Sequence, residues 1–170
     1  IAATNPCGEQ PLPPNGACLL GSFNLVKYVY RDRKGKMQFD YSTLEANIPH
    51  VVRAMDNVVD RAVYPLAKQE KEAKDKRRMG LGVTGVANAI EALGHPYGSE
   101  GFMDKLEWIM STIRDGCYNA SIDLAREKGP FPLYDNKYLD SAFAKTLPDY
   151  IRNDISRGGI RNSHLLSVAP

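Results

Sequence analysis

Apolar residues recur every three or four positions over two long stretches of the chain, which is the period of a helix that buries one face. The first stretch runs from Tyr41 to Ala62, and Ser42 or Thr43 is available to cap its start. Pro49 lies inside this pattern, and proline disrupts a helix interior. We therefore expect either a helix kinked at Pro49 or a new helix start near Asn47.

The second stretch runs from Met103 to Leu124, with Ser99 before it as a cap and Gly129-Pro130 after it as a stop. Cys117 falls on the apolar stripe of this helix. Because free cysteine commonly behaves as a small hydrophobic residue, we interpret Cys117 as part of the core and not as a redox group.

Shorter apolar runs predict strands. Residues 18–30 are rich in β-forming side chains and end in a polar turn over 31–36. Residues 79–85 form a brief apolar strand that leads into a helix over 86–93. These two segments predict strands on either side of the first long helix.

Two motifs near the second strand suggest nucleotide or phosphate binding only weakly. Gly80, Gly82 and Gly85 resemble a dinucleotide fingerprint, but no acidic residue follows a second strand at the usual distance, so we expect close packing of strand against helix. Lys68–Arg78 contains six cationic and three acidic residues. Without interleaved aromatic residues, we interpret this run as a solvated helical face.

The end of the chain completes an alternating pattern. One more helix is expected over 148–157, and residues 160–170 pass from polar sequence to a buried-strand pattern. Strands that alternate with helices favour an α/β fold with parallel strands. In such folds the chemistry lies on loops at strand ends, where we expect Cys7 and residues 167–170.

Composition excludes several classes of protein. The chain has 170 residues, of which 43% are hydrophobic, so it can bury one substantial core. Its 22 Lys and Arg against 20 Asp and Glu give a net charge of +2, which argues for neither a nucleic-acid nor a membrane partner. The sequence shows neither an apolar run of about 18 residues nor a signal-peptide pattern, so a cytoplasmic setting is expected.

The cysteines and histidines do not suggest a disulfide framework or a metal site. Three widely spread cysteines favour reduced thiols that are available for chemistry. His50, His95 and His164 have no metal-ligand spacing with one another or with the cysteines. We therefore expect no bound metal.

The two ends of the chain suggest a segment of something larger. The sequence starts at Ile1, shortly before its most informative motif, and stops at Pro170 directly after a strand-like run. Termini of self-contained domains normally fray in polar sequence. We expect residues 1–170 to form a single segment that is incomplete at both ends.

The stretch Asn5-Pro6-Cys7-Gly8-Glu9 combines three side chains that can take part in catalysis within five residues. In an extended backbone, residues two apart point to the same side. Asn5, Cys7 and Glu9 would then offer an amide, a thiol and a carboxylate to one site. The alternative is an ordinary loop that happens to carry a cysteine.

Three further motifs follow this stretch in order: Ala17–Leu25, Arg77–Val83 and Arg161–Pro170. Together the four motifs resemble the catalytic (large) subunit of ribonucleotide reductase and span nearly the whole chain. The resemblance implies a partial ten-stranded α/β barrel, of which this chain is a central and later part. It also implies that Cys7 lies at the tip of a finger loop that runs through the barrel centre.

The resemblance assigns a role to each matching residue. Cys7 matches the cysteine that becomes a thiyl radical and takes the 3′ hydrogen of the ribose. Glu9 matches the carboxylate that accepts the 3′ hydroxyl proton, and Asn5 matches the amide that binds the substrate hydroxyls. Cys18 matches one of two thiols that reduce the substrate as the 2′ hydroxyl leaves as water. Pro170 matches the first position of the loop that binds the substrate phosphates.

The resemblance also implies partners and a radical source. The second reducing cysteine, the rest of the phosphate loop and the allosteric sites would lie in flanking segments, so the segment should not turn over alone. A thioredoxin- or glutaredoxin-type reductant and a dimeric enzyme are implied as well. Pro6 and Gly8 beside the cysteine look more like the adenosylcobalamin-dependent class than the class served by a separate metal-containing radical subunit.

Two other hypotheses remain open at this point. The chain could be a nonenzymatic α/β module or split-gene piece that acts only when assembled with flanking chains. It could also be a dithiol redox protein in which Cys7 and Cys18 form a disulfide with each other.

Overall fold

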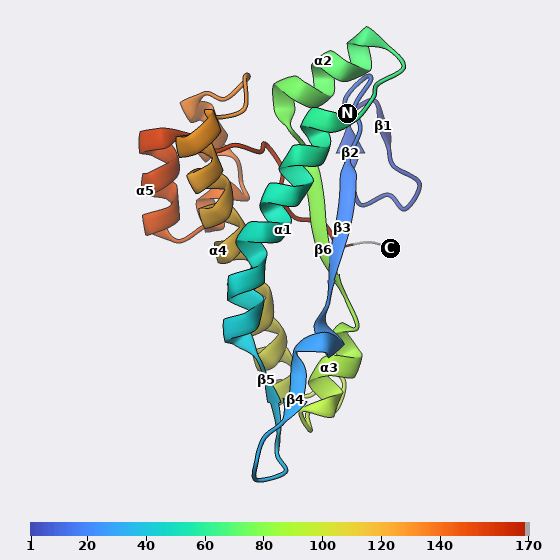
Figure 1. Cartoon of the computed structure of the whole chain (residues 1–170), viewed down its shortest axis with the longest axis vertical. Helices are drawn as coiled ribbons and strands as arrows, with labels where there is room; N and C mark the ends of the chain where they lie inside the picture. The colour runs from blue at the N-terminus through green and yellow to red at the C-terminus, as the bar shows by residue number, and fades with distance from the viewer. Residues whose placement is uncertain (169–170) are drawn as a thin grey trace.

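A computed structural model describes residues 1–168. At its centre two parallel strands, β3 and β6, lie side by side, and helices α1 and α4 cover one side of them (Figure 1). In chain order the elements are β1 (Ala3–Thr4), β2 (Pro11–Leu12), β3 (Leu19–Asn24), η1 (Leu25–Tyr28), β4 (Val29–Arg31), β5 (Met37–Phe39), α1 (Tyr41–Arg61), α2 (Ala67–Lys76), β6 (Met79–Thr84), α3 (Val86–Ala92), α4 (Glu100–Lys128), η2 (Asn136–Asp140), η3 (Ala144–Thr146) and α5 (Asp149–Gly158). The expected α/β architecture with parallel strands is confirmed.

The two long helices form as the apolar pattern predicts, although α1 has a different cap. Asp40 caps it, because the Asp40 carboxylate accepts hydrogen bonds from Thr43 N at 2.9 Å and Thr43 Oγ1 at 2.7 Å. The predicted caps Ser42 and Thr43 are therefore wrong and lie inside the first turn. The helix is continuous through Pro49, so the alternative of a new start near Asn47 is wrong as well.

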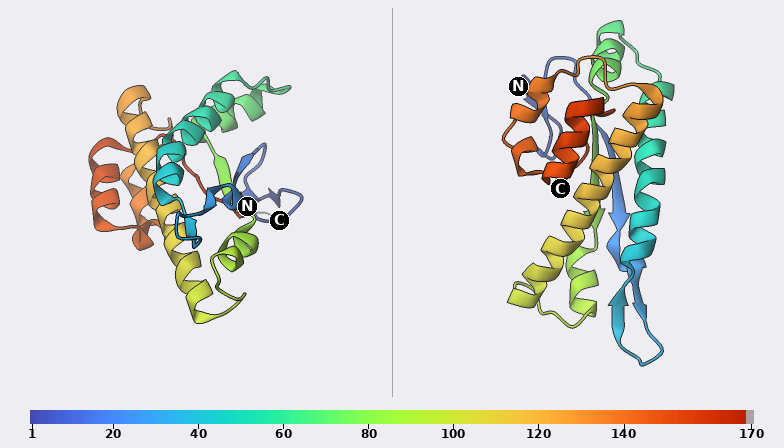
Figure 2. Two further views of the ribbon diagram at one scale, coloured as in Figure 1. Left: turned by 60° about the horizontal axis from the view of Figure 1, so that its bottom comes forward. Right: turned by 90° about the vertical axis from the view of Figure 1, so that its left-hand side faces the viewer.

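Helix α4 begins and ends where its capping residues predict. The Ser99 hydroxyl accepts a hydrogen bond from Phe102 N at 3.2 Å, and Gly129 at the other end has a φ of +84°, which favours glycine. The two long helices pack against each other closely (Figure 2). A Cβ at Gly116 of α4 would lie 2.8 Å from Ile48 Cδ1 of α1, so this crossing needs a residue without a side chain.

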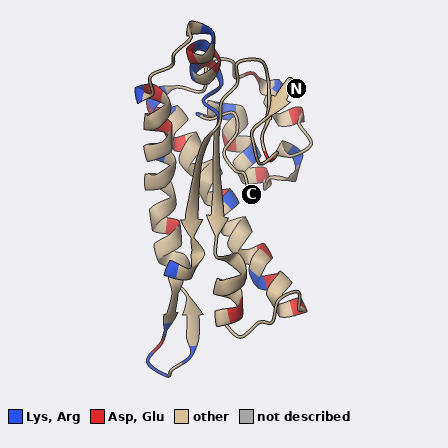
Figure 3. Ribbon diagram, turned by 90° about the vertical axis from the view of Figure 1, so that its right-hand side faces the viewer, with Lys and Arg blue, Asp and Glu red and all other residues tan. Residues whose placement is uncertain are grey.

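The segment predicted as one strand over residues 18–30 is divided into three elements. Strand β3 ends at Asn24, the short helix η1 follows, and β4 then pairs with β5 in an antiparallel hairpin. The side chain of Asn24 causes the break, because its Oδ1 accepts a hydrogen bond from Val26 N at 3.2 Å and caps η1. The tip of the hairpin carries several cations, whereas β3 and β6 carry no charged residue (Figure 3).

Helix α2 carries most of the charges between residues 68 and 78. Three ion pairs of 2.6 Å join residues four positions apart along the helix: Lys71–Asp75 and Lys74–Glu70, and the partly buried Lys76–Glu72. The solvated helical face expected for this run is confirmed over residues 67–76. The two arginines that follow it, Arg77 and Arg78, are instead buried.

The glycines of β6 serve a different contact from the one expected. A Cβ at Gly82 would lie 2.2 Å from the carbonyl oxygen of Ser167, and a Cβ at Gly80 would lie 2.9 Å from Nε2 of Gln10. These glycines therefore let the C-terminal chain and the N-terminal hairpin approach the strand, and close packing against a helix is not their role. Gly85 is separate, because it caps α3 with a φ of +70°.

The C-terminal chain runs beside β6 without forming the predicted strand. Met79 N donates to His164 O at 3.0 Å, and Leu81 N donates to Leu165 O at 2.8 Å. Only one isolated parallel bridge forms, between Leu81 and Leu166. The last two positions of the predicted strand, 169 and 170, lie outside the described residues.

A buried carboxylate joins the separate parts of the fold. Asp56 of α1 is completely buried and accepts hydrogen bonds from Arg77 Nε at 2.9 Å, Asn162 Nδ2 at 3.0 Å and Arg161 Nε at 3.3 Å. Asn162 is also completely buried and accepts a hydrogen bond from the Ser121 hydroxyl of α4 at 2.9 Å. This cluster links α1, the start of β6, α4 and the C-terminal chain.

We predict that Asp56→Asn destabilises the protein by about 3–5 kcal/mol, because it leaves the buried Arg77 without a full counter-charge. Chemical denaturation followed by circular dichroism measures the change. Asp123→Asn is the matched control, since Asp123 pairs with Arg126 on the surface, where both side chains are more than half exposed. The control should cost less than about 1 kcal/mol. Equal effects of the two substitutions would contradict the role assigned to Asp56.

We also predict that Gly82→Ala destabilises the protein by about 1–3 kcal/mol, because the new methyl group would collide with the Ser167 carbonyl. Gly158→Ala is the control, because a Cβ there would meet no atom within 4 Å. Thermal unfolding compares the two variants. A Gly82→Ala protein as stable as the Gly158→Ala protein would show that the chain near Ser167 does not press against β6.

Candidate functional site

The N-terminal motif forms the turn of a small hairpin. Strands β1 and β2 pair in antiparallel fashion, with Ala3 opposite Leu12 and Thr4 opposite Pro11. Gly8 N donates a hydrogen bond to Asn5 O at 3.0 Å, and Gly8 has a φ of +79°. Residues 5–8 therefore form a turn. The expectation of an extended backbone, from which the side chains of Asn5, Cys7 and Glu9 would point to one side, is wrong.

The turn nevertheless brings two of the three predicted side chains into contact. Asn5 Nδ2 donates a hydrogen bond to Glu9 Oε1, and Asn5 Oδ1 accepts one from Gln10 N at 3.0 Å. The other carboxylate oxygen, Glu9 Oε2, is buried without a hydrogen-bond partner in the described part of the chain. Such an oxygen is unusual in a folded protein, and its lone pairs can accept a proton or a hydrogen bond from a hydroxyl group.

Gln10 fixes this hairpin to the central strands. Its side chain is 4% exposed, and its amide lies against Gly80 of β6. The hairpin therefore packs on the side of the strand pair opposite α1, whose Met55 contacts the other face at Gly21. The amide and carboxylate of Asn5 and Glu9 are held next to the sheet.

Cys7 lies within the turn, with an exposed and free thiol. Its side chain makes no hydrogen bond with any of residues 1–168. Another segment or molecule can therefore reach this sulfur. The position fits a reactive group presented by a loop, whereas a core role for Cys7 is excluded.

Cys18 precedes β3 and is half-buried. Its thiol donates a weak hydrogen bond to Leu19 O at 3.7 Å. Burial raises the pKa of the Cys18 thiol to about 11, the Arg78 guanidinium opposes this rise, and the Glu9 carboxylate adds to it. The thiol is therefore protonated at neutral pH.

The three cysteines are all free, so the structure contains no Cys7–Cys18 disulfide. Cys117 is completely buried within α4, and burial raises the pKa of its thiol to about 12. The interpretation of Cys117 as a core residue is confirmed.

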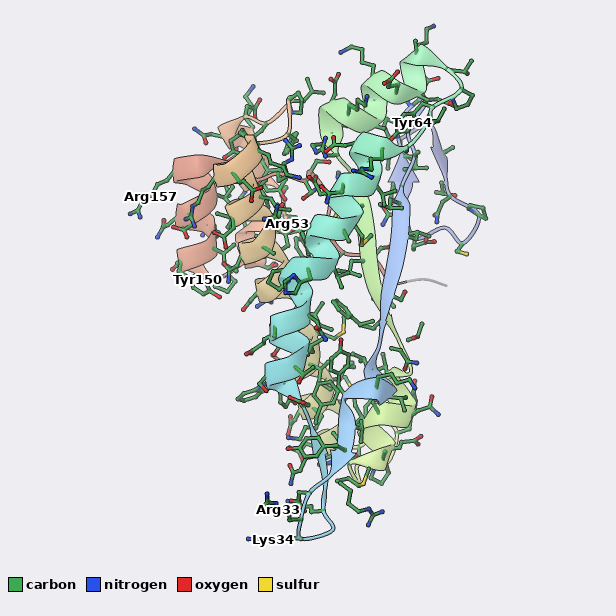
Figure 4. The ribbon with its side chains drawn as sticks, in the orientation of Figure 1. Arg33, Lys34, Arg53, Tyr64, Tyr150 and Arg157 are labelled. Atoms are coloured by element: carbon green, nitrogen blue, oxygen red, sulfur yellow. The ribbon has the colours of Figure 1, made fainter. Side chains whose placement is uncertain are left out.

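A small cavity of about 170 Å³ opens beside Cys18. Arg78 and Tyr64 line it together with apolar residues of α1 and α2. Figure 4 shows Tyr64 just beyond the end of α1, near the start of the central strands. The sequence pattern did not single out Arg78, because it follows directly after a run of surface charges. Its position immediately before an apolar strand was the signal that could have found it.

The remaining features that could indicate a site are a second hollow, a metal-ligand cluster, a membrane helix and the position of Pro170. A hollow of about 810 Å³ lies along α1 and α4 near Trp108, and none of the predicted site residues lines it. Within residues 1–168, no group of three or more His, Cys, Asp or Glu side chains could hold a metal ion. No helix in this part of the chain is long and apolar enough to cross a membrane. Pro170 lies outside the described residues, so its predicted contact with phosphate stays a prediction.

The chain is similar to known proteins over its whole length. A family model described as ribonucleotide reductase, barrel domain, matches residues 1–170. A vitamin B12-dependent ribonucleoside-diphosphate reductase of Mycobacterium tuberculosis is 38% identical over 170 residues, which are 100% of this chain and 22% of that protein. A protein of the same description from Thermoplasma acidophilum is 40% identical over 134 residues, 79% of this chain and 17% of that protein.

A more distant relative belongs to the variola virus. The large subunit of its ribonucleoside-diphosphate reductase is 29% identical over 144 residues, which cover 78% of this chain and 19% of the viral protein. This chain spans about a fifth of the length of the curated relatives that it matches. The match of the family model over every residue shows that the chain belongs to the ribonucleotide reductase family and corresponds to part of its barrel domain.

Proposed function

We propose that the chain is a segment of the catalytic barrel of a ribonucleotide reductase, which converts ribonucleoside di- or triphosphates to deoxyribonucleotides. The observation that carries this proposal is the turn over residues 5–9. It carries the exposed thiol of Cys7 and, two positions along the chain, the carboxylate of Glu9, which has one oxygen bound to Asn5 and the other buried without a partner among residues 1–168. A thiol, a base and an amide are the groups that the reaction needs at the ribose.

In this proposal Cys7 acts as a thiyl radical and takes the 3′ hydrogen atom of the ribose. Glu9 accepts the proton of the 3′ hydroxyl through Oε2, which has no competing partner among residues 1–168. Asn5 orients both the carboxylate and the substrate hydroxyls. Each group would act within hydrogen-bond reach of the same side of the sugar, which requires the turn to keep its shape.

Cys18 would supply reducing equivalents as the 2′ hydroxyl leaves as water, and it would then form a disulfide with a second cysteine. Neither Cys7 nor Cys117 fits this second role, because Cys7 carries the radical and Cys117 is completely buried. The second cysteine, and the remainder of the phosphate loop that begins at Pro170, would come from flanking segments. We therefore propose a ten-stranded barrel as the complete catalytic unit, with the hairpin over residues 3–12 as its finger loop.

The complete enzyme would take its radical from adenosylcobalamin, as the names of two relatives in the vitamin B12-dependent group suggest. The exposed thiol of Cys7 fits a generator that approaches the hairpin turn from outside this chain. Adenosylcobalamin supplies the initial radical when it is bound, and the protein supplies the position of the sulfur. A separate metal-containing subunit is the alternative source, since the variola virus relative is named as a large subunit.

The remaining parts of the proposal concern partners and location. A thioredoxin- or glutaredoxin-type dithiol would reduce the disulfide that contains Cys18, and the full enzyme would be a dimer. The three free thiols fit a reducing compartment such as the cytoplasm. The chain alone should not turn over, since it spans about a fifth of its relatives.

We predict that Cys7→Ser in the complete reductase abolishes formation of deoxyribonucleotides, because a hydroxyl O–H bond is too strong to exchange hydrogen with a sugar carbon. Product analysis by chromatography measures the loss, and equilibrium dialysis should show that nucleotide binding is retained. Cys117→Ala is the matched control, since it removes a thiol from the core and should leave turnover of the folded enzyme unchanged. Residual turnover by Cys7→Ser would refute the proposed role.

We further predict that Glu9→Gln lowers the turnover number by about 10²–10⁴-fold, which is the usual contribution of a general base. The amide keeps the size of the side chain and can still bind Asn5, so the fold of the turn should persist. Steady-state kinetics at saturating nucleotide measure the effect, and Glu45→Gln on the exposed surface of α1 is the control. A Glu9→Gln enzyme with turnover within twofold of the control would remove Glu9 from the mechanism.

A further inference from the structure

Arg78 is a buried cation without a partner. The residue is 7% exposed, and its side chain makes no hydrogen bond or ion pair with any of residues 1–168. Its neighbour Arg77 is equally buried but is bound by two carboxylates, those of Asp56 and Asp60. Buried arginines are normally paired, because an unpaired charge is costly to remove from water. None of the Arg78 nitrogens is among the fully buried unpaired atoms of residues 1–168, so the guanidinium meets solvent at the cavity and is free to pair with an anion formed there.

The sheet places Arg78 beside Cys18. Strands β3 and β6 are parallel, and Leu19 at the start of the first pairs with Met79 at the start of the second. Cys18 and Arg78 each precede these residues by one position, so they are neighbours across two strands that lie about 4.8 Å apart. Both side chains line the same cavity of about 170 Å³.

We propose that Arg78 is the counter-ion of the Cys18 thiolate, kept buried and unpaired so that this enclosed thiol can ionise when it exchanges with a disulfide. Arg78 is thus a positioning residue that acts through Cys18 and does not touch the nucleotide. The inference about its role in turnover rests on the proposed function. The inference about ionisation of Cys18 does not.

The charges around the thiol support this assignment. Arg78 is the one group that favours the thiolate among those that shift the pKa of Cys18, since burial and the Glu9 carboxylate both oppose ionisation. Tyr64 also lines the cavity. The charge of Glu72 also acts on Arg78, but the Glu72 carboxylate already pairs with Lys76 at 2.6 Å. Burial in turn lowers the pKa of Arg78, while Cys18 and Glu72 oppose that change.

The proposed step is a thiol–disulfide exchange. The thiolate of a dithiol reductant attacks the sulfur bonded to Cys18, the sulfur–sulfur bond breaks, and its electron pair remains on the sulfur of Cys18. Arg78 stabilises this thiolate until it takes a proton from solvent. The second thiol of the reductant then attacks the mixed disulfide, so that the reductant leaves as a disulfide and the protein regains two thiols. A lower-energy thiolate on the leaving sulfur makes the first attack faster.

The test measures the reactivity of Cys18 directly. In the complete protein carrying Cys7→Ser, iodoacetamide alkylates Cys18, and mass spectrometry of the Cys18 peptide follows the rate as a function of pH. Arg78→Met should lower the rate at about pH 9 by tenfold or more, because loss of an adjacent opposite charge raises a pKa by about 1–3 units. Arg78→Lys keeps the charge and should restore at least part of the rate.

Arg33→Met is the matched control, since Arg33 lies on the tip of the β4–β5 hairpin, at the end of the molecule away from Tyr64 (Figure 4). It should leave the alkylation profile unchanged. Arg78→Met should also unfold no more readily than the parent protein, because the guanidinium has no partner to lose. An unchanged alkylation profile would overturn the proposal, and so would failure of Arg78→Met to fold, which would show that Arg78 has a structural partner.

A turnover assay separates this inference from the proposed function. In the complete reductase with Cys7 intact, Arg78→Met should slow dithiol-driven turnover while a single turnover of the pre-reduced enzyme is unchanged. If the alkylation profile shifts but the complete protein reduces no nucleotide even with Arg78 in place, then the proposed function fails and the ionisation role of Arg78 stands.

Discussion

The arrangement of this chain depends on a single carboxylate that has no contact with solvent. Asp56 lies on the buried face of α1, where the surrounding positions are apolar, and three side chains from distant parts of the sequence donate hydrogen bonds to it. A buried charge tolerates few geometries, because each unpaired lone pair costs free energy. The carboxylate therefore sets where the start of β6 and the C-terminal chain can lie relative to α1.

This constraint reaches the candidate site through the two central strands. Arg77 binds Asp56 and has a left-handed backbone with a φ of 49°, so it turns the chain from α2 into β6 at a defined point. Because β3 pairs with β6 in a fixed register, the position of Arg77 also determines where Cys18 stands. Because Gly80 has no side chain, the Gln10 amide can lie against it. This contact anchors the hairpin that carries Cys7. The polar cluster and the reactive turn are thus connected by one strand.

Apolar periodicity was sufficient to predict where the two long helices lie, because local sequence decides it, whereas the cap of α1 and the division of residues 18–30 were not predicted. The ends of α4 at Ser99 and Gly129 and the core position of Cys117 were predicted as well. The final strand was not predictable, because its partial pairing depends on how closely Ser167 can approach a glycine from another part of the chain.

The motif was sufficient to locate the candidate site in the sequence, but it did not predict how the side chains are arranged. Asn5 and Glu9 meet because a turn brings them together, whereas the alternation of an extended strand suggested the contact for the wrong reason. Arg78 lay within the motif Arg77–Val83 but was given no role, and Asp56 was not noticed, since a lone acid in an apolar stripe and a base after a charged run both look like surface residues. Only the fold shows that each is buried.

One edge of the small parallel sheet affects how the isolated chain behaves during refolding. Within residues 1–168, β3 pairs with β6 alone, so the amide and carbonyl groups along its other edge have no strand beside them. An open edge of this kind templates pairing with another chain. Refolding of these 170 residues alone at high concentration should therefore favour edge-to-edge aggregates, and co-expression with a segment that supplies the neighbouring strand should prevent them.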